Sequence, residues 1–223
     1  SYLDDFESTQ SGMDLLNPYA WNLASTPYED SNPKFPEAEK VNDIAYGKNR
    51  ALLAWYTVDG IFTRKSSSSR PRHLTNDDLS NHYTRGVSYK EIFPNKELGT
   101  NDNTTLPVLN LAFYPNERGP YNLDAENVNS DGTLGNPEKR WGGVMRKIEP
   151  SDLESANYEY IEFWLLDPYL EDETAEGGDL YFNLGEISED ILKDERKFFE
   201  NGMPVDGDMS KVDTTVWGKV PRT

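Results

Sequence analysis

Short runs of apolar residues recur along the chain, with turn residues between them. Aromatic and β-branched residues favour a pleated sheet, and alternation of apolar and polar positions is typical of strands. We therefore predict strands at 2–7, 51–59, 107–114, 143–148, 158–166 and 179–184. Many short strands separated by turns predict a mainly β fold, an antiparallel β-sandwich of jelly-roll type.

The alternation is clearest in the run 158–166. Trp164 shares one face with Tyr160 and Glu162, while Phe163 lies on the other face with Ile161. If the sheet is sandwiched or covered, we expect both Trp164 and Phe163 to be buried. On that basis Phe163→Ala should cost about 3–5 kcal/mol of stability.

Helix signals are fewer. Ser188 is a suitable N-cap with acidic residues after it, and Asn201-Gly202 supplies a stop, so we predict a helix over 189–200. A second short helix is predicted near Asn76. We expect one domain over 1–223, with long loop insertions near 25–50 and 64–106. Neither end closes with an element of its own, and we expect the domain to be part of a larger parent chain.

The charge balance is strongly acidic. The chain has 40 Asp and Glu against 22 Lys and Arg, a net charge of -18 at pH 7. Such a surface repels nucleic-acid phosphates and anionic lipids, so we expect neither as a partner. Cysteine is absent, which excludes disulfides and thiolate metal sites. No apolar run approaches the length of about 18 residues that a membrane-spanning helix needs.

The sequence offers little for catalysis. It has two histidines, His73 and His82, and neither a G-x-S-x-G elbow nor an H-E-x-x-H zinc motif. A Glu162 buried beside Trp164 could have a raised pKa and serve glycoside hydrolysis. An ion-paired sheet residue explains Glu162 more simply, since structural ion pairs also perturb carboxylates. We therefore predict no enzymatic activity and no required cofactor.

Tryptophans are candidate platforms for stacking on sugars. Trp55 and Trp164 lie in predicted strands and are expected in the core. Trp141 and Trp217 precede glycines in loops and are the better candidates for exposed platforms.

The sharpest local pattern comprises Asn127, Asn129, Asp131 and Glu138. Their spacing matches the oxygen ligands of a twelve-residue calcium loop, with Asn127 in place of the usual first Asp. The alternative is a hairpin turn on Asp131-Gly132, which Pro137 and the lack of flanking helices favour. Calcium, in a structural role, is the expected ligand if the domain binds any ion.

Several longer motifs resemble a known family. They are YPNERGPYN (114–122), RWGGVMR (140–146), IEFWLLDPY (161–169), GGDLYFNLGEISEDILKD (177–194) and WGKVP (217–221). They resemble the SprA (Sov) family of gliding-motility and secretion proteins, over nearly the whole chain from about Leu3 to Val220. The resemblance implies the outer-membrane translocon of the type 9 secretion system, a very large β-barrel through which folded cargo passes.

Within that family, the resemblance implies a soluble segment, because the chain lacks the alternating lipid-facing strands of a barrel wall. It places the segment in the cell envelope, associated with the outer membrane at the cell surface or in the barrel lumen. Its expected partners are the remainder of the translocon and secreted cargo or partner secretion subunits.

The opening residues and the IEFW strand also look like galactose-binding-like jelly rolls. Such folds often hold a structural ion near the first strand. Asp5 and Glu7 point the same way along a strand, so they form a second candidate calcium site.

These observations predict a non-catalytic structural or interaction domain of a protein-export translocon. The alternative is a carbohydrate-binding module for cell-surface glycans, a role that many jelly rolls fill. A glycoside hydrolase is a distant third.

Overall fold

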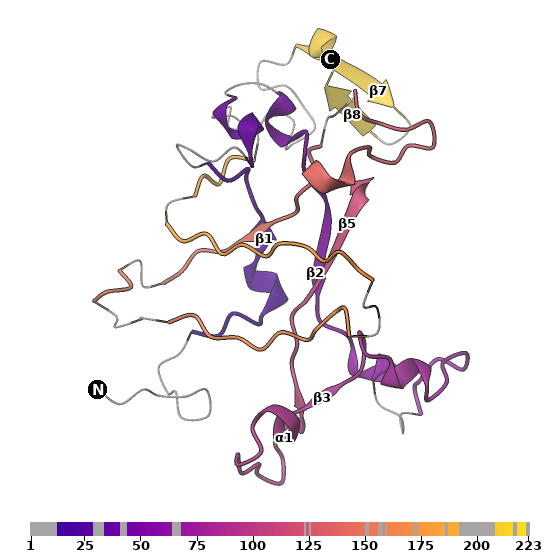
Figure 1. The fold of residues 1–223 in the computed structure, drawn as a ribbon, viewed down its shortest axis with the longest axis vertical. Coiled ribbons are helices and arrows are strands. Elements are labelled where there is room, and N and C mark those ends of the chain that lie inside the picture. The colour runs from indigo at the N-terminus through magenta and orange to yellow at the C-terminus, as the bar shows by residue number, and fades with distance from the viewer. Residues whose placement is uncertain are drawn as a thin grey trace. The chain divides into compact units, whose positions relative to one another are not determined.

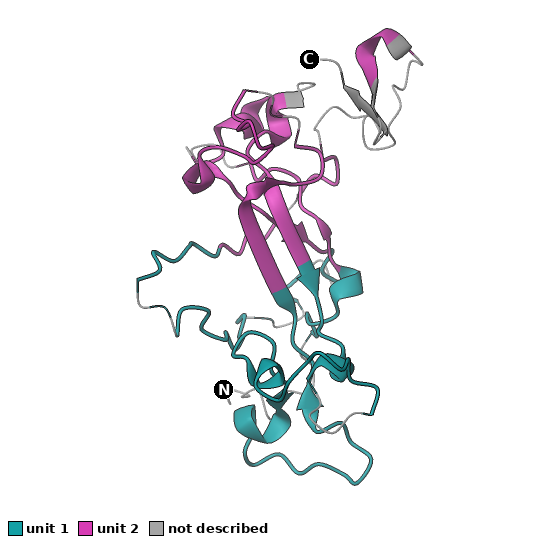
Figure 2. Ribbon diagram, turned by 90° about the vertical axis from the view of Figure 1, so that its right-hand side faces the viewer, with its two compact units in different colours: residues 1–20, 55–110, 147–180 teal, residues 21–54, 111–146, 181–223 magenta. Residues whose placement is uncertain are grey.

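The computed structural model describes most of the chain in two compact units (Figures 1 and 2). Unit 1 comprises residues 1–20, 55–110 and 147–180, and unit 2 comprises residues 21–54, 111–146 and 181–223. The described residues are 13–28, 34–40, 44–63, 68–122, 124, 126–149, 152–155, 158, 160–170, 172, 174–185, 187–191, 208–215 and 218–221.

The strands of unit 2 come together from distant parts of the sequence. β1 (Asn22–Leu23) pairs antiparallel with β6 (Val144–Met145). β2 (Ala51–Tyr56), which is apolar throughout, is hydrogen-bonded to β5 (Asn110–Arg118). β7 (Val212–Thr215) and β8 (Gly218–Pro221) form an antiparallel pair. Continuous apolar runs such as β2 are typical of strands that are covered on both faces.

Short 3₁₀ helices complete unit 2. They are η2 (Pro36–Glu39), η3 (Ile44–Gly47), η6 (Pro137–Lys139) and η8 (Met209–Lys211). η2 and η6 both begin with proline, whose fixed φ suits a first helical position where no N–H bond is needed.

Unit 1 is held by small local elements. β3 (Val87–Ser88) pairs antiparallel with β4 (Thr105–Leu106). The single turn of α-helix, α1 (Tyr89–Ile92), begins after Ser88, whose side chain accepts a hydrogen bond from the backbone N–H of Lys90 at 3.2 Å. The 3₁₀ helices are η1 (Pro18–Ala20), η4 (Gly60–Phe62) and η5 (Asp78–Ser80).

The expectation of little helix and of antiparallel strand pairing is confirmed in its coarse form, because the described residues contain several small antiparallel two-stranded sheets and little helix. Strands occur within three of the predicted runs, as β2, β5 and β6, and β5 continues beyond the predicted end to Arg118. The sheets of the described residues are small and two-stranded, and they form no sandwich or jelly roll.

Other sequence predictions have different outcomes. Residues 160–166 and 179–184, predicted as strands, belong to no strand of the structure (Figure 1, orange). Residues 189–191 of the predicted helix are not helical, and 192–200 lie outside the described residues, as does the predicted strand 2–7. The helix expected near Asn76 is the 3₁₀ turn η5.

The single domain over 1–223 with two long insertions stays a prediction. Both insertions carry short elements of their own. Residues 25–50 contain η2 and η3, and residues 64–106 contain η5, β3, α1 and β4.

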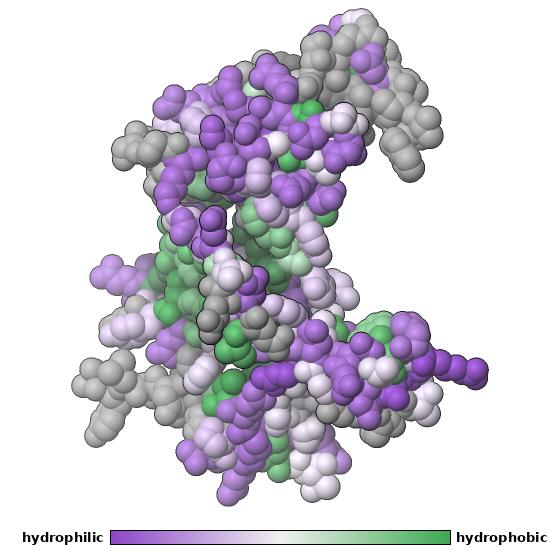
Figure 3. All heavy atoms as spheres, turned by 45° about the vertical axis from the view of Figure 1, so that its right-hand side comes forward, coloured by the Kyte–Doolittle hydropathy of each residue, from purple (hydrophilic) through white to green (hydrophobic). Residues whose placement is uncertain are grey.

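The buried residues include almost as many polar as apolar side chains. The fully buried apolar residues are Ala24, Ala38, Tyr46, Ala51, Leu79, Val87, Leu134 and Val212. The buried polar residues are Ser25, Thr26, Glu37, Arg50, Asn122, Asp124 and Arg140, all in unit 2. Many large apolar residues lie at the surface instead, and the face drawn in Figure 3 shows some of them among hydrophilic ones.

Candidate functional site

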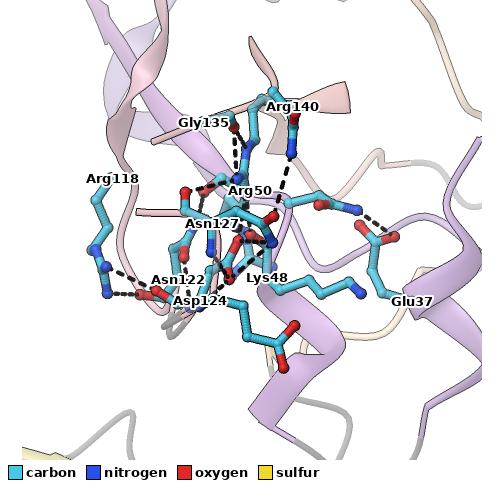
Figure 4. A network of polar contacts seen from close by, with 12 residues as sticks. Glu37, Lys48, Arg50, Arg118, Asn122, Asp124, Asn127, Gly135 and Arg140 are labelled. Atoms are coloured by element: carbon cyan, nitrogen blue, oxygen red, sulfur yellow. Dashed lines mark hydrogen bonds and ion pairs between the residues drawn. The ribbon is translucent and has the colours of Figure 1, made fainter. Parts of the chain in front are cut away.

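A buried ion pair lies at the centre of the polar residues of unit 2 (Figure 4). Arg140 Nη1 lies 3.0 Å from Asp124 Oδ2, and the two side chains are only 1% and 3% exposed. The same guanidinium donates to the carbonyl oxygen of Lys48 at 2.6 Å and to that of Gly135 at 2.8 and 2.9 Å. A buried charge is tolerated where its hydrogen-bonding capacity is used in this way.

Asp124 is equally well bonded on its own side. Its Oδ1 accepts from the backbone N–H groups of Glu126 at 3.1 Å and Asn127 at 3.2 Å, and the Asn127 amide donates to both oxygens. Burial raises the pKa of Asp124 and is the largest single influence. The hydrogen bonds from Asn127, Glu126 and Arg140 together outweigh it, so the pKa lies below its ordinary value.

Asn122 connects this ion pair to the chain before β2. Its amide donates to the carbonyl oxygens of Lys48, at 3.0 Å, and of Arg50. Arg118, at the end of β5, donates back to the carbonyl oxygens of Asn122 and Asp124 at 3.3 and 2.9 Å. The turn that follows β5 is therefore tied both to its own strand and to the entry of β2.

A second buried arginine is less well satisfied. Arg50 is fully buried, its guanidinium carbon lies 5.1 Å from the centre of the Trp141 ring, and its Nη1 donates weakly to Pro120 O at 3.5 Å. Among the described residues, no hydrogen-bond partner reaches its Nε or Nη2. Burial lowers the pKa of Arg50 to about 10, opposed by the charges of Tyr46 and Glu37.

Glu37 fixes the other side of Trp141. This buried carboxylate accepts from Trp141 Nε1 at 3.0 Å and from the Asn49 amide at 3.0 Å. The ring of Phe35 packs edge-on against Trp141 at 5.7 Å between centroids. Trp141 is thus a half-buried anchor of unit 2. The suggestion that it is a platform for sugars stays a prediction.

Two glycines permit the close packing around these residues. A Cβ on Gly119 would lie 2.4 Å from the carbonyl oxygen of Ala51, and one on Gly142 would lie 2.8 Å from Leu53 Cβ. Both glycines belong to the longer motifs, 114–122 and 140–146. The glycines of these motifs allow two chain segments to approach closely. The arginines and the asparagine of the same motifs then hold the segments together by hydrogen bonds.

The ion pair at the centre of the network is shielded from solvent, whereas Arg118 at its edge is exposed. With Arg140 and Asp124 almost fully buried and bonded to each other, a dissolved substrate has no access to them. Sequence reasoning missed this network, although Arg118, Asn122, Asp124 and Arg140 lie in or between the two motifs. The signal in the sequence that could have indicated the network was the combination of Asn122, Asp124 and Arg140 with glycines nearby.

The candidate calcium ligands lie on a tight turn. Asp131 Oδ1 accepts from the backbone N–H of Thr133 at 3.0 Å and from its hydroxyl at 2.7 Å, and the Asn129 amide donates to the same hydroxyl at 2.9 Å. The two hydrogen bonds that Thr133 donates to Asp131 lower the pKa of Asp131, and the bond from the Thr133 hydroxyl has the larger effect. An isolated bridge joins Val128 to Leu134 across the turn.

The other calcium candidates lie elsewhere. Asn127 donates to Asp124, and Glu138 lies in η6. Asp5 and Glu7 lie outside the described residues. In the described part of the chain, no group of three or more His, Asp or Glu is placed to hold a metal ion. Calcium binding stays a prediction.

The remaining described candidates are exposed or half-buried. His82 Nε2 lies 2.5 Å from the carbonyl oxygen of Asp167, and Glu162 is on the surface. Trp164, expected in the core, is 64% exposed. Trp55 is half-buried, with its Nε1 donating to Pro18 O at 3.1 Å. Trp217 lies outside the described residues.

Extended segments with exposed apolar side chains are the other distinctive feature. In unit 1 the segment 160–170 exposes Tyr160, Ile161, Phe163, Trp164, Leu165, Leu166, Tyr169 and Leu170. In unit 2 the segment 181–187 exposes Tyr181, Phe182, Leu184 and Ile187. Burial of both faces of 158–166 was expected for a sandwiched or covered sheet. The described residues form no such sheet, and Phe163 and Trp164 are 52% and 64% exposed.

In comparisons with known proteins, no family model and no curated protein matches the sequence. Among the helices of the described residues, none combines the length and apolar character that crossing a bilayer requires.

Proposed function

We propose that this chain is a non-catalytic structural and interaction domain of a cell-envelope protein-export translocon of the type 9 secretion kind. The observation that carries the proposal is the segment 160–170, which ends in a turn at 168–170 and whose large apolar side chains face water. Contiguous apolar surface of this kind marks a site of contact with other protein. The domain works by contacting the remainder of the translocon, its cargo or its partner subunits at the outer membrane.

The motifs that resemble the SprA family support the same role. Arg118, Asn122 and Arg140 are bonded within unit 2, and Gly119 and Gly142 allow its closest contacts. These residues hold unit 2 together. A chain that carries both motifs therefore has the residues that form these contacts. The proposal needs no nucleophile, metal or cofactor.

The proposal extends to the fold. We expect residues 160–166 and 179–184 to join neighbouring strands in an antiparallel sandwich of jelly-roll type once the contacting protein is present. Their alternating or continuous apolar residues suit strands with covered faces.

A genetic experiment tests the proposed function. In the bacterium that encodes this chain, the region of the gene that encodes the chain is deleted in frame. Secretion of cargo into the medium and gliding on agar are then measured. We expect both to be lost while the shortened parent protein is still found in the outer membrane by immunoblot. Undiminished secretion and gliding with the segment removed would refute the proposal.

Exposed aromatic residues keep a carbohydrate-binding module as the second candidate. Tyr160 and Trp164 are 65% and 64% exposed and lie four positions apart, on the same face of an extended chain. Exposed aromatic rings on one face can stack on sugars. A glycan array separates the two candidates. Specific binding that Trp164→Ala abolishes would favour the glycan module, and no binding is expected for the translocon domain.

A further inference from the structure

Segment 160–166 of unit 1 is anchored at its C-terminal end. There His82 Nε2 contacts Asp167 O, and the Tyr83 hydroxyl donates to Pro168 O at 2.8 Å. Before the segment, the backbone N–H of Tyr158 closes a local turn by donating to Leu153 O at 2.9 Å. The seven residues 160–166 belong to no described strand. Anchoring at one end lowers the entropy that a partner must remove on binding.

The side chains of the segment are exposed on both faces. Phe163 and Leu165, on one face, are 52% and 68% exposed, and Trp164 on the other face is 64% exposed. An extended chain with exposed apolar residues is a template for pairing with another strand. Added strands gain affinity from main-chain hydrogen bonds and specificity from alternate side chains.

The sequence after the segment is strongly acidic. Residues 167–179 contain six carboxylates and no Lys or Arg. Of these, Asp167, Asp172, Glu176 and Asp179 are described and exposed. If a strand from another protein paired with 160–166, the residues next to that strand would lie near these carboxylates. Positive charge on those residues would favour binding, and negative charge would oppose it.

We propose that residues 160–166 accept an added β-strand from a protein partner, and that the partner strand is apolar at alternate positions and flanked by Lys or Arg. The inference rests on the proposed function, to which it adds the surface and the chemistry of the partner. A second copy of this chain fits less well, because each copy carries a net charge of -18 and like-charged copies repel. In an antiparallel pairing the basic residues precede the apolar run of the partner; in a parallel pairing they follow it.

Synthetic peptides test the proposal on the whole chain. The probe is a fluorescent peptide of alternating valine and threonine with three lysines at its N-terminus, and its pair carries the lysines at the C-terminus. One control has glutamates in place of the lysines, and another has proline at the central position. Binding is measured by fluorescence anisotropy at low and at high salt.

We expect one lysine peptide to bind at least about tenfold more tightly than the glutamate peptide at low salt, with the difference shrinking as salt screens the charges. The proline peptide should not bind, since it lacks a ladder N–H and clashes with a paired strand. Equal binding of the lysine and glutamate peptides would overturn the charge requirement. Equal binding of the proline peptide would overturn strand addition.

Matched variants locate the site on the chain. Leu165→Pro should abolish binding, while Leu165→Ala should only weaken it, because the alanine keeps the backbone N–H. The triple variant Asp172→Asn, Glu176→Gln, Asp179→Asn should bring the lysine and glutamate peptides to similar affinity. Circular dichroism and urea unfolding show whether each variant folds, and the proline peptide gives an answer that needs no variant.

Two further readouts separate the possible failures. A dimer seen by sedimentation and lost in Leu165→Pro would show that a second copy is the occupant, which overturns the proposal. If no peptide binds but the Leu165→Pro allele still abolishes secretion in the bacterium, the proposed function stands and strand addition is rejected. Peptide binding with normal secretion after removal of the segment would reject the function alone.

Discussion

Arg140 and Asp124 face each other across 3.0 Å inside unit 2, with both side chains almost sealed from water. The arginine also donates to the backbone carbonyls of Lys48 and Gly135, so one side chain connects three separate stretches of chain. Contacts of this kind fix which segments meet, and their loss leaves the partner charge buried and unpaired.

Breaking this pair should therefore be costly. We expect Arg140→Met to lower the free energy of unfolding by about 3–5 kcal/mol, as the loss of one partner of a buried pair does. Arg50→Met is the matched comparison, because Arg50 is equally buried but two of its nitrogens lack a hydrogen-bond partner among the described residues. Urea unfolding measures both. A larger loss for Arg50→Met would contradict this assignment of roles.

The stability of unit 2 should fall in acid through Asp124. The folded-state pKa of Asp124 is below its ordinary value. Its contribution is therefore complete above the unfolded-state pKa of about 3.9 and is lost as pH falls through the folded value. In urea unfolding between about pH 5 and pH 3, Asp124→Asn should be less stable at the upper end and should show a shallower pH dependence than the parent protein. Asp77→Asn, at an exposed position, is the control and should leave the dependence unchanged.

Gly119 should not accept a side chain. Its added Cβ would lie 2.4 Å from the backbone oxygen of Ala51, which cannot turn aside as a side chain can. We expect Gly119→Ala to cost at least about 1–3 kcal/mol, the usual cost of overpacking. Gly86→Ala is the control, because the nearest atom there is a Thr105 methyl group at 3.5 Å. Equal thermal stability of the two variants would show that β2 and the turn after β5 are not in close contact.

Phe163→Ala should have a small effect on the isolated chain. The side chain is 52% exposed, so we expect a loss below about 1 kcal/mol, in place of the larger cost expected for a buried strand. Leu134→Ala, at a position 1% exposed, should cost about 2–5 kcal/mol. Thermal unfolding compares the two. A large loss for Phe163→Ala would mean that the segment is covered in solution.

Calcium is the remaining sequence prediction to test. If the loop from Asn127 to Glu138 binds the ion, excess calcium should raise the melting temperature over that in chelator, because a ligand stabilises the state that binds it. Asp131→Ala should remove a rise due to this loop, and Glu7→Ala a rise due to the Asp5 and Glu7 pair. Identical melting in calcium and in chelator would remove both candidate sites and leave Asp131-Gly132 as a turn held by hydrogen bonds.

The burial of the tryptophans could not be predicted from the local sequence pattern. Trp141 precedes two glycines, a loop pattern that suits a surface platform, but Glu37 and Phe35 hold it half-buried in unit 2. Trp164 lies in an apolar run and was expected in the core, but it faces water. Both expectations used the local pattern, whereas burial depends on which distant segments come to lie on a side chain.

What the sequence determined by itself is local. The apolar run of β2, the alternation of 160–166 and the scarcity of helix signals follow from side-chain pattern and backbone propensity, which act over a few residues. The net charge of -18 likewise needs no structure. Only the tertiary structure decided that Asp124 meets Arg140 and that Asn122 reaches the carbonyl of Lys48, across 74 positions of sequence. Such pairings depend on the path of the backbone through the whole unit, because a buried charge is stable only where distant carbonyls and amides converge on it.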